Sequence, residues 1–367
     1  MSLEKPKRKI RLEVFDLLRG FYIFGIIVNH LALFPNIFMY LTGATKLWLS
    51  FAEGFFLISG FFVGFLYRHK IVTDFWGVTK KITKRAFKLY LWTVYLTFVF
   101  TYWGNLMPAG TVKEALWIVH YDNLAELFFK AFTYQYQYGW ADILPYYSIY
   151  LLITPFFLCL LSMGYYKWLI LLSLAVWTMR LKSSYFAVQV IYFGGLTLGF
   201  YYQQIKDWWF GVSKSKRLFV ERSVLWIFAL SLLTCLVSVF YFNDLAKYLP
   251  YTDLLIHKNR VLNWYFDKQY VGPGRLILSP LWHLALLFIF SRYIKQIKRV
   301  LGWLLLVFGK NSLYSYMFHA FVIYPIPYFF IVFELGGFWL NSLVSLFCLL
   351  LVWIFTKHTA WYFKGKI

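Results

Sequence analysis

The chain has 367 residues, of which 61% are hydrophobic and 14% are charged. Soluble globular domains carry about 25% charged and about 45–50% apolar residues, so this composition argues against a soluble fold, a disordered chain and a disulfide scaffold. A membrane-spanning helix needs about 20 apolar residues, so the length holds about ten spans with short connections. We expect an all-α, polytopic membrane protein whose residues 1–367 form one membrane-embedded domain.

The charge balance indicates how the chain lies in the membrane. The formal net charge is +22, from 37 Lys and Arg against 15 Asp and Glu. The basic residues fall between apolar runs, as in cytoplasmic loops of membrane proteins, so we expect a lipid bilayer and no nucleic acid as partner. The basic run at residues 5–11 precedes the first apolar run without a small-residue cleavage site. We expect a retained first helix, both termini in the cytoplasm and a place in the inner, cytoplasmic membrane.

In chain order, the apolar runs predict about ten spans. We place them at roughly residues 14–34, 47–67, 86–106, 141–162, 167–182, 185–204, 219–243, 275–291, 312–333 and 338–356. Basic inner loops are expected at residues 68–88, 206–222 and 292–310. Two long outer segments are rich in Tyr, Trp, Asn and Asp, and they cover residues 107–140 and 244–274. Segments of this length without a domain of their own are usually functional or loosely ordered.

Ionisable side chains within a span are costly and often functional, and the first span contains Asp16, Arg19 and His30. Arg19 and His30 are eleven residues apart, about 20° past three full turns, so they share a helix face with about 16 Å between them along the axis. On the expected topology, Arg19 lies near the cytoplasmic end and His30 near the outer end. A snorkelling charge at Arg19 and a packing histidine at His30 are the alternatives.

The second span carries Glu53 and Ser59, with Gly54 and Gly60 beside them. This span runs inward, so Glu53 lies at a depth similar to that of His30. A carboxylate there would orient the imidazole and raise its basicity. The glycines would permit close helix approach, and a buried helix-packing pair is the alternative to a catalytic role.

The ninth span begins with polar residues at helical spacing. One face of this helix carries, at i, i+3, i+4 and i+7, Ser312, Ser315, Tyr316 and His319. A polar stripe in a span faces protein or a water-filled cavity, so these residues are candidates for substrate binding. Hydrogen bonding between helices is the alternative, and it applies more strongly to His283 in the eighth span.

A basic cluster follows the second span and includes Lys81, Lys84, Arg85 and Lys88. Its density suits a polyanionic phosphate group, although positive-inside topology accounts for such a run without a ligand. At the other face, residues 134–142 alternate aromatic side chains with amides, as a sugar-binding segment or an interfacial aromatic belt would. The sequence has no phosphate-binding glycine loop and no metal-ligand cluster, so we expect no metal.

Several blocks of the sequence resemble the acyltransferase-3 superfamily. The first block is Phe15–Gly20 followed by His30, in which Arg19 and His30 form an R-x10-H pattern. The other two are the block Phe55–Phe61 and the segment Asn311–His319. A narrower resemblance is to the OpgC-type osmoregulated periplasmic glucan succinyltransferases. It rests on Glu53 ahead of Ser59-Gly60, on the segments Arg85–Tyr90, Asp142–Tyr147 and Asp267–Arg275, and on Trp282-His283.

The resemblance implies an integral membrane O-acyltransferase that takes an acyl group from cytoplasmic acyl-CoA and transfers it to an extracytoplasmic glycan. It implies that His30 is the essential base and that Arg19 serves the acyl donor. Succinyl is the acyl group that the narrower resemblance implies. The same blocks supply further candidates for substrate binding, namely Asp16, Ser59, Asp142, Tyr147, Asp267, Lys268, Arg275, Ser312, Tyr316 and His319.

These residues make up one mechanistic hypothesis. His30 takes the proton of a sugar hydroxyl while Glu53 orients its ring, since a neutral imidazole suits general-base work. The phosphates of the donor bind the four-residue basic cluster. The tetrahedral oxyanion accepts hydrogen bonds from Ser312, Tyr314 or Tyr316. A succinate carboxylate requires a cation, for which Lys268 and Arg275 are candidates.

Two other functions compete with this hypothesis. Polar stripes across ten spans also fit a transporter or flippase for a glycan or a lipid-linked sugar. Inverted repeats with broken helices would favour transport, and the sequence has no detectable repeat of that kind. A structural partner in an envelope complex is the third possibility, which the ionisable residues within apolar spans disfavour.

Overall fold

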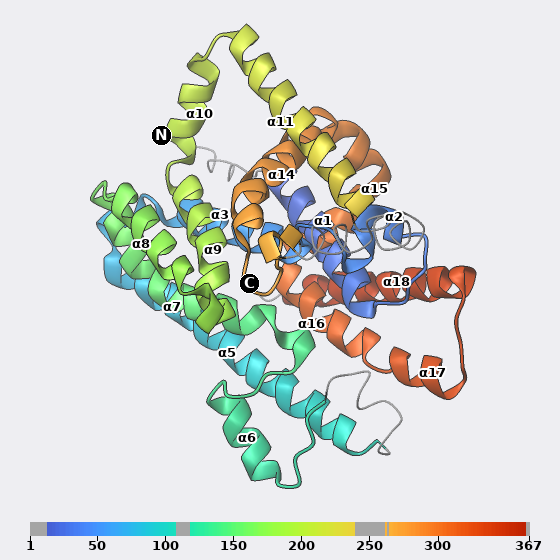
Figure 1. Ribbon diagram of the computed structural model, residues 1–367. Coiled ribbons are helices and arrows are strands. Elements are labelled where there is room, and N and C mark those ends of the chain that lie inside the picture. Colours follow the sequence, from blue (N-terminus) through green and yellow to red (C-terminus); the bar gives the residue numbers. More distant parts are fainter. Residues whose placement is uncertain (1–12, 108–117, 239–260, 263, 365–367) are drawn as a thin grey trace, which may run out of the picture.

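In the computed structural model, the structure describes residues 13–107, 118–238, 261–262 and 264–364, and every regular element within these ranges is helical (Figure 1). The shorter helices are α2 Met39–Thr42, α4 Lys70–Thr73, α6 Leu124–Phe132, α10 Tyr202–Gly211 and α17 Ile326–Val332. The longer ones are α1 Glu13–Leu31, α3 Phe51–Tyr67, α5 Phe75–Asn105, α7 Ile143–Ser162, α8 Tyr166–Thr178, α9 Ser184–Phe200, α11 Lys214–Leu236, α14 Pro273–Arg292, α15 Ile294–Lys310, α16 Ser312–Ile323 and α18 Phe338–Lys364. The predicted all-α class is confirmed.

Within the described residues, six helical stretches are long and apolar enough to cross a membrane. They are Glu13–Leu31, Gly139–Ser162, Lys214–Leu236, Pro273–Arg292, Ser312–Val332 and Phe338–Thr359. Three shorter apolar helices, α3, α8 and α9, also coincide with predicted spans. The chain is therefore a helical membrane protein, while the count of ten spans and the side of each terminus stay predictions.

Helix α1 lies at the centre of the helical assembly. In its apolar stretch 67% of the residues are buried, against 11% in α11. It contacts α3, α14, α15, α16 and α18. Since a span that contacts five others has little surface left for lipid, the polar side chains of α1 face protein.

Close helix contacts depend on small residues, as the glycines of the second span predict. Gly60 of α3 faces the carbonyl of Tyr192 in α9, and Gly195 of α9 faces the carbonyl of Leu57 in α3. A Cβ at either glycine would overlap the opposite backbone. Small residues at such interfaces allow two membrane helices to approach closely. This reciprocal contact holds α3 and α9 at a fixed distance.

All three predicted basic loops are largely helical, which corrects the sequence-based expectation, and residues 206–222 fall mostly in α10 and α11. Helix α5 begins at Phe75, where the Asp74 side chain accepts a hydrogen bond from the backbone N–H of Gly77 at 2.8 Å. The loop predicted at residues 292–310 is mostly α15, which buries Leu304, Leu305 and Phe308 against its neighbours. Lysines and arginines interrupt the apolar residues in the first part of α5 and in α15, so neither stretch contains a long apolar run in the sequence.

Some predictions fall on residues outside the described ranges. These are the basic run at residues 5–11, part of the first outer segment at residues 108–117 and the larger part of the second outer segment at residues 244–260.

Candidate active site

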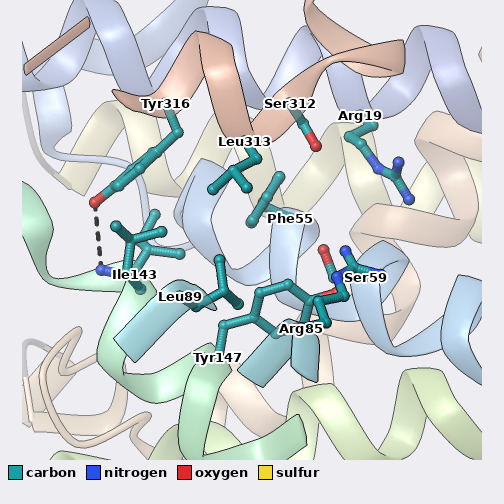
Figure 2. A pocket seen from close by; sticks show the side chains of 11 residues that line it. Arg19, Phe55, Ser59, Arg85, Leu89, Ile143, Tyr147, Ser312, Leu313 and Tyr316 are labelled. Atoms are coloured by element: carbon teal, nitrogen blue, oxygen red, sulfur yellow. Dashed lines mark hydrogen bonds between the residues drawn. The ribbon is translucent and has the colours of Figure 1, made fainter. Parts of the chain in front are cut away.

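A small pocket with a cavity volume of about 30 Å³ opens between α1, α3, α5, α7 and α16 (Figure 2). It is lined by Arg19, Phe55, Ser59, Arg85, Leu89, Ile143, Leu144, Tyr147, Ser312, Leu313 and Tyr316. Six of these are predicted site residues from five separate helices, namely Arg19, Ser59, Arg85, Tyr147, Ser312 and Tyr316. The fold thus gathers around one cavity residues that lie far apart in the sequence.

One end of the pocket is cationic. Figure 2 shows Arg19 reaching from one wall toward Ser59 and Arg85 on the opposite wall. The Arg19 guanidinium lies 4.2 Å from the centroid of the Phe62 ring, and its Nη1 donates to the carbonyl of Gly309 at 3.5 Å. Its Nε is buried without a hydrogen-bond partner among the described residues. A buried donor with no partner is costly, so this end of the pocket is suited to an acceptor from a ligand.

Arg85 supplies the second cation of this end. Its guanidinium lies 5.2 Å from the centroid of the Tyr147 ring, and the side chain is exposed. None of the described residues that line the pocket is acidic. Two guanidinium groups without a lining carboxylate form a site for an anion, since the planar fork of arginine matches phosphate and carboxylate groups.

The middle of the pocket is apolar and its far end is polar. Phe55, Leu89 and Leu313 lie between the arginines and Tyr316 (Figure 2). The Tyr316 hydroxyl donates to Oδ1 of Asp142 at 2.9 Å and accepts from the backbone N–H of Ile143 at 3.3 Å. Because its proton is used by Asp142, Tyr316 is not a free donor for an oxyanion, in contrast to our sequence-based hypothesis.

A histidine pair lies next to Tyr316. Nδ1 of His30 is hydrogen-bonded to Nε2 of His319 at 2.9 Å, and Nδ1 of His319 is hydrogen-bonded to the backbone carbonyl of Tyr316. The ring centroids of His30 and Tyr316 are 6.4 Å apart. His30 does not line the pocket, but it packs against Tyr316, which does. Arg19 therefore lines the pocket itself, whereas His30, on the same predicted face of α1, is connected to the pocket through the side chain of Tyr316.

Glu53 has partners other than His30. Its carboxylate forms a buried ion pair with Nη1 of Arg275 and accepts from the hydroxyl of Ser50 at 3.1 Å. Glu53 and Ser50 also form a capping box at the start of α3. The expectation that Glu53 orients the His30 ring is therefore not supported by any contact in the described residues. The contact to the ring of His30 comes from His319 instead.

The Arg275 guanidinium is also fully occupied by partners within the protein. Its Nε donates to the carbonyl of Phe266 at 2.7 Å, its Nη2 donates to the carbonyl of Leu47 at 3.3 Å, and the residue is 2% exposed. A buried guanidinium that is paired and hydrogen-bonded on every side cannot also bind a substrate carboxylate. The expectation for Arg275 is corrected for this reason.

Lys268 and Asp267 lie in the turn before α14. Oδ1 of Asp267 accepts from the backbone N–H of Tyr270 at 2.7 Å and closes this turn. The Lys268 side chain is exposed, and its ammonium group interacts electrostatically with Asp142 and with His30. Of these two predicted residues, Lys268 is the one placed to meet a ligand beside the histidine pair.

The remaining predicted residues lie outside the pocket. Asp16 is buried where α1 crosses α15, with its carbonyl against Gly309. Three predicted phosphate ligands are exposed on the face of α5 that also carries Arg85, namely Lys81, Lys84 and Lys88. Nζ of Lys88 lies 5.7 Å from the ring centroid of Tyr314.

The aromatic segment at residues 134–142 mainly packs within the protein. The Tyr134 hydroxyl is hydrogen-bonded to that of Ser148 at 2.9 Å, and the Tyr136 hydroxyl accepts from Thr101 at 3.3 Å. Tyr138 is 1% exposed. Burial raises the pKa of Tyr136 above its ordinary value. These contacts show packing within the protein, which differs from both the sugar-binding segment and the interfacial belt that the sequence suggested.

His283 also has a packing environment. Its Nδ1 is hydrogen-bonded to the hydroxyl of Tyr22 at 2.9 Å, and both side chains are buried. This contact joins α14 to α1, as the alternative for His283 predicts.

Sequence reasoning missed the apolar middle of the pocket and the role of His319 as the neighbour of His30. The first could not be found, because Phe55, Leu89 and Leu313 resemble every other apolar residue of the spans. The second had a signal, since His319 was already placed on the polar face of its helix.

The fold and the site define a class of protein: a polytopic helical membrane protein with a pocket that is lined by two arginines and ends beside a histidine pair. The chain belongs to the OpgC protein family, whose model matches residues 8–364. The family name supports a membrane transferase that modifies glucans. No curated protein and no solved structure matches the chain.

Proposed function

We propose that this protein is an O-acyltransferase that moves an acyl group from cytoplasmic acyl-CoA to a hydroxyl of an extracytoplasmic glucan. The observation that carries the proposal is one pocket with Arg19 and Arg85 at one end and, at the other, Tyr316 beside His30 and His319. An anion site and a candidate base, separated by an apolar stretch, suit a donor that is anionic at one end and reactive at the other.

The topology belongs to the same proposal. With ten spans and both termini in the cytoplasm of the cell, Arg19 lies near the inner surface and His30 near the outer surface of the inner membrane. The distance of about 16 Å between them along α1 suits the extended arm that joins the phosphates of CoA to its thioester. We assign the path of that arm to the apolar middle formed by Phe55, Leu89 and Leu313, where the cavity of about 30 Å³ must widen to admit it.

The donor is held by its charge. Its phosphates meet Arg19 and Arg85 in the pocket, and those closer to solvent meet the exposed lysines on the same face of α5, Lys81, Lys84 and Lys88. Charge-assisted hydrogen bonds from arginine to phosphate are strong and directional, whereas exposed lysines act as point charges. The two arginines therefore set donor affinity more than the lysines do.

The chemistry requires a base for the acceptor hydroxyl. His30 removes the hydroxyl proton as the oxygen attacks the thioester carbonyl carbon. Collapse of the tetrahedral intermediate breaks the C–S bond and expels the CoA thiolate, which takes that proton from His30 to give the free thiol. A general base contributes roughly 10²–10⁴ to the rate of such a step. Ser312 lines the pocket near Arg19 rather than beside His30 (Figure 2), so it is not placed to donate to that oxyanion.

Succinyl is the proposed acyl group, because the sequence resembles the OpgC-type glucan succinyltransferases. Its carboxylate pairs with Lys268, because this ammonium group is exposed and interacts electrostatically with the His30 region. Arg275 does not serve, since Glu53 and two backbone carbonyls occupy it.

The test is acyl transfer by purified protein in proteoliposomes, with succinyl-CoA on the side of the basic face and a linear or cyclic glucan on the other. The measurements are CoA release and the mass of the glucan. A mass increase of one succinyl group per CoA released supports the proposal. Movement of glucan without CoA release would establish the transport alternative, and full turnover by well-folded His30→Ala would remove His30 as the base.

A further inference from the structure

The imidazoles of His30 and His319 form a hydrogen-bonded chain that ends on a backbone carbonyl. Nδ1 of His319 meets the carbonyl oxygen of Tyr316, and Nε2 of His319 meets Nδ1 of His30 at 2.9 Å. His319 is 0% exposed, whereas His30 is partly exposed. No carboxylate is hydrogen-bonded to either ring in the part of the chain that the structure describes.

The carbonyl at the end of the chain determines where the protons are. A carbonyl oxygen only accepts, so Nδ1 of His319 carries a proton and donates it. A fully buried imidazole without a carboxylate partner is neutral, because burial of an unpaired charge is costly. Neutral imidazole has a single N–H, so Nε2 of His319 bears a lone pair and accepts from Nδ1 of His30. Nε2 of His30 is then the nitrogen that bears its lone pair.

We propose that His319 is a positioning residue that holds His30 in the tautomer with a proton on Nδ1, so that Nε2 of His30 is the atom that accepts the proton of the acceptor hydroxyl. The proposal rests on the proposed function for the identity of the reaction. The orientation of the base is supplied by the carbonyl of Tyr316 through a neutral histidine, in place of the carboxylate that usually fixes such a ring.

The arrangement also limits the proton movement to one nitrogen. When Nε2 of His30 takes the hydroxyl proton, its Nδ1–H remains donated to His319, and this hydrogen bond strengthens because its donor becomes charged. The proton returns from the same Nε2 to the CoA thiolate when the tetrahedral intermediate collapses. No proton passes to His319 at any stage.

The groups that face His30 are His319 and Tyr316 of α16 and Lys268 ahead of α14. Asp142, ahead of α7, accepts from Tyr316 and is the next titratable group along this contact. Lys268 opposes a positive charge on His30. The pH dependence of the rate is therefore compared in variants that leave Lys268 and Asp142 in place.

The kinetic test compares His319→Leu with His319→Gln and with the matched control His283→Leu, which also removes a buried histidine. We expect His319→Leu to lower kcat roughly 10–100-fold, less than the full roughly 10²–10⁴ of a general base because His30 itself remains, with KM for acyl-CoA unchanged. His319→Gln presents an amide oxygen to Nδ1 of His30 and restores part of kcat. His283→Leu keeps kcat per folded molecule. An unchanged kcat and pH profile in folded His319→Leu overturns the proposal.

The spectroscopic test does not depend on catalysis. In protein labelled with ¹⁵N-histidine, the nitrogen chemical shifts distinguish a ring nitrogen that carries a proton from one that bears a lone pair. We expect a protonated Nδ1 and an unprotonated Nε2 at His30, assigned by loss of its signals in His30→Ala. A protonated Nε2 in the wild-type protein would overturn the tautomer. If the protein transfers no acyl group, the proposed function fails while this measurement still decides the tautomer.

Discussion

Glu53 of α3 and Arg275 of α14 form a buried ion pair, with 4% and 2% of the two residues exposed. Arg275 also donates to the carbonyls of Phe266 and Leu47, so one guanidinium joins three segments of the chain. The segment at Phe266 leads directly into the turn that carries Lys268. The pair therefore fixes the turn that carries Lys268 beside the histidine pair.

We predict that Glu53→Gln destabilises the protein by about 3–5 kcal/mol, because it leaves the Arg275 charge buried without a counter-charge. The double variant Glu53→Leu with Arg275→Met recovers much of this loss, since apolar residues replace both charges together. Unfolding in detergent, followed by circular dichroism, measures the change.

The matched control for that measurement is the exposed pair Glu13 and Lys298, in which Nζ of Lys298 lies 3.0 Å from Oε2 of Glu13. Removal of Lys298 should cost less than about 1 kcal/mol, as for other exposed ion pairs. An equal loss of stability from both pairs would mean that burial does not set the strength of the Glu53–Arg275 pair.

A second prediction concerns the cationic end of the pocket. Arg19→Ala and Arg85→Ala should each raise KM for acyl-CoA about 10–100-fold, since a hydrogen bond to a charged group is worth about 1.5–3 kcal/mol and about 1.4 kcal/mol is tenfold in affinity. Binding of CoA alone, measured by calorimetry, should weaken in parallel. The control is Lys206→Ala on α10, an exposed cation of a different helix. If only the KM for glucan changed, the two arginines would belong to the acceptor site.

A third prediction concerns the acyl group. Lys268→Ala should lower kcat/KM for succinyl-CoA about tenfold more than kcat/KM for acetyl-CoA, because only the succinyl group carries a carboxylate for the ammonium group to bind. Lys182→Ala, an exposed cation in the turn after α8, serves as the control. Equal losses for the two donors would contradict the assignment of Lys268 to the acyl carboxylate.

Much of the helical content and of the pocket could be predicted from the sequence. Long apolar runs located α3 and the six helices that can cross a membrane, and the ionisable or hydroxyl residues in those runs include Arg19, Ser59, Ser312 and Tyr316, which line the pocket. Such residues can be found from the sequence because burial of a polar side chain in a span costs free energy, so its presence there indicates a functional or structural role.

Pairing between residues could not be predicted in the same way. The sequence paired Glu53 with His30 only because their positions within their spans give them a similar depth in the membrane. In the structure Glu53 lies beside Arg275, and His30 lies beside His319. Which neighbour a side chain meets depends on the rotation of each helix and on contacts such as that of Gly309 with Asp16. Helix α15 was missed for a related reason, because its apolar face is only one stripe of a basic segment.

The last prediction uses two adjacent glycines of α9 that face different surroundings. A Cβ at Gly195 would overlap the backbone carbonyl of Leu57 in α3, whereas a Cβ at Gly194 has no atom within 4 Å. Gly195→Ala should therefore destabilise the protein by about 1–3 kcal/mol, since the backbone of α3 must move away, as in other overpacked interiors. Gly194→Ala should be neutral or stabilise by up to about 1 kcal/mol, because alanine favours the helix. Thermal unfolding of both variants in the same detergent measures the difference, and equal midpoints would show that α3 and α9 do not depend on their close contact.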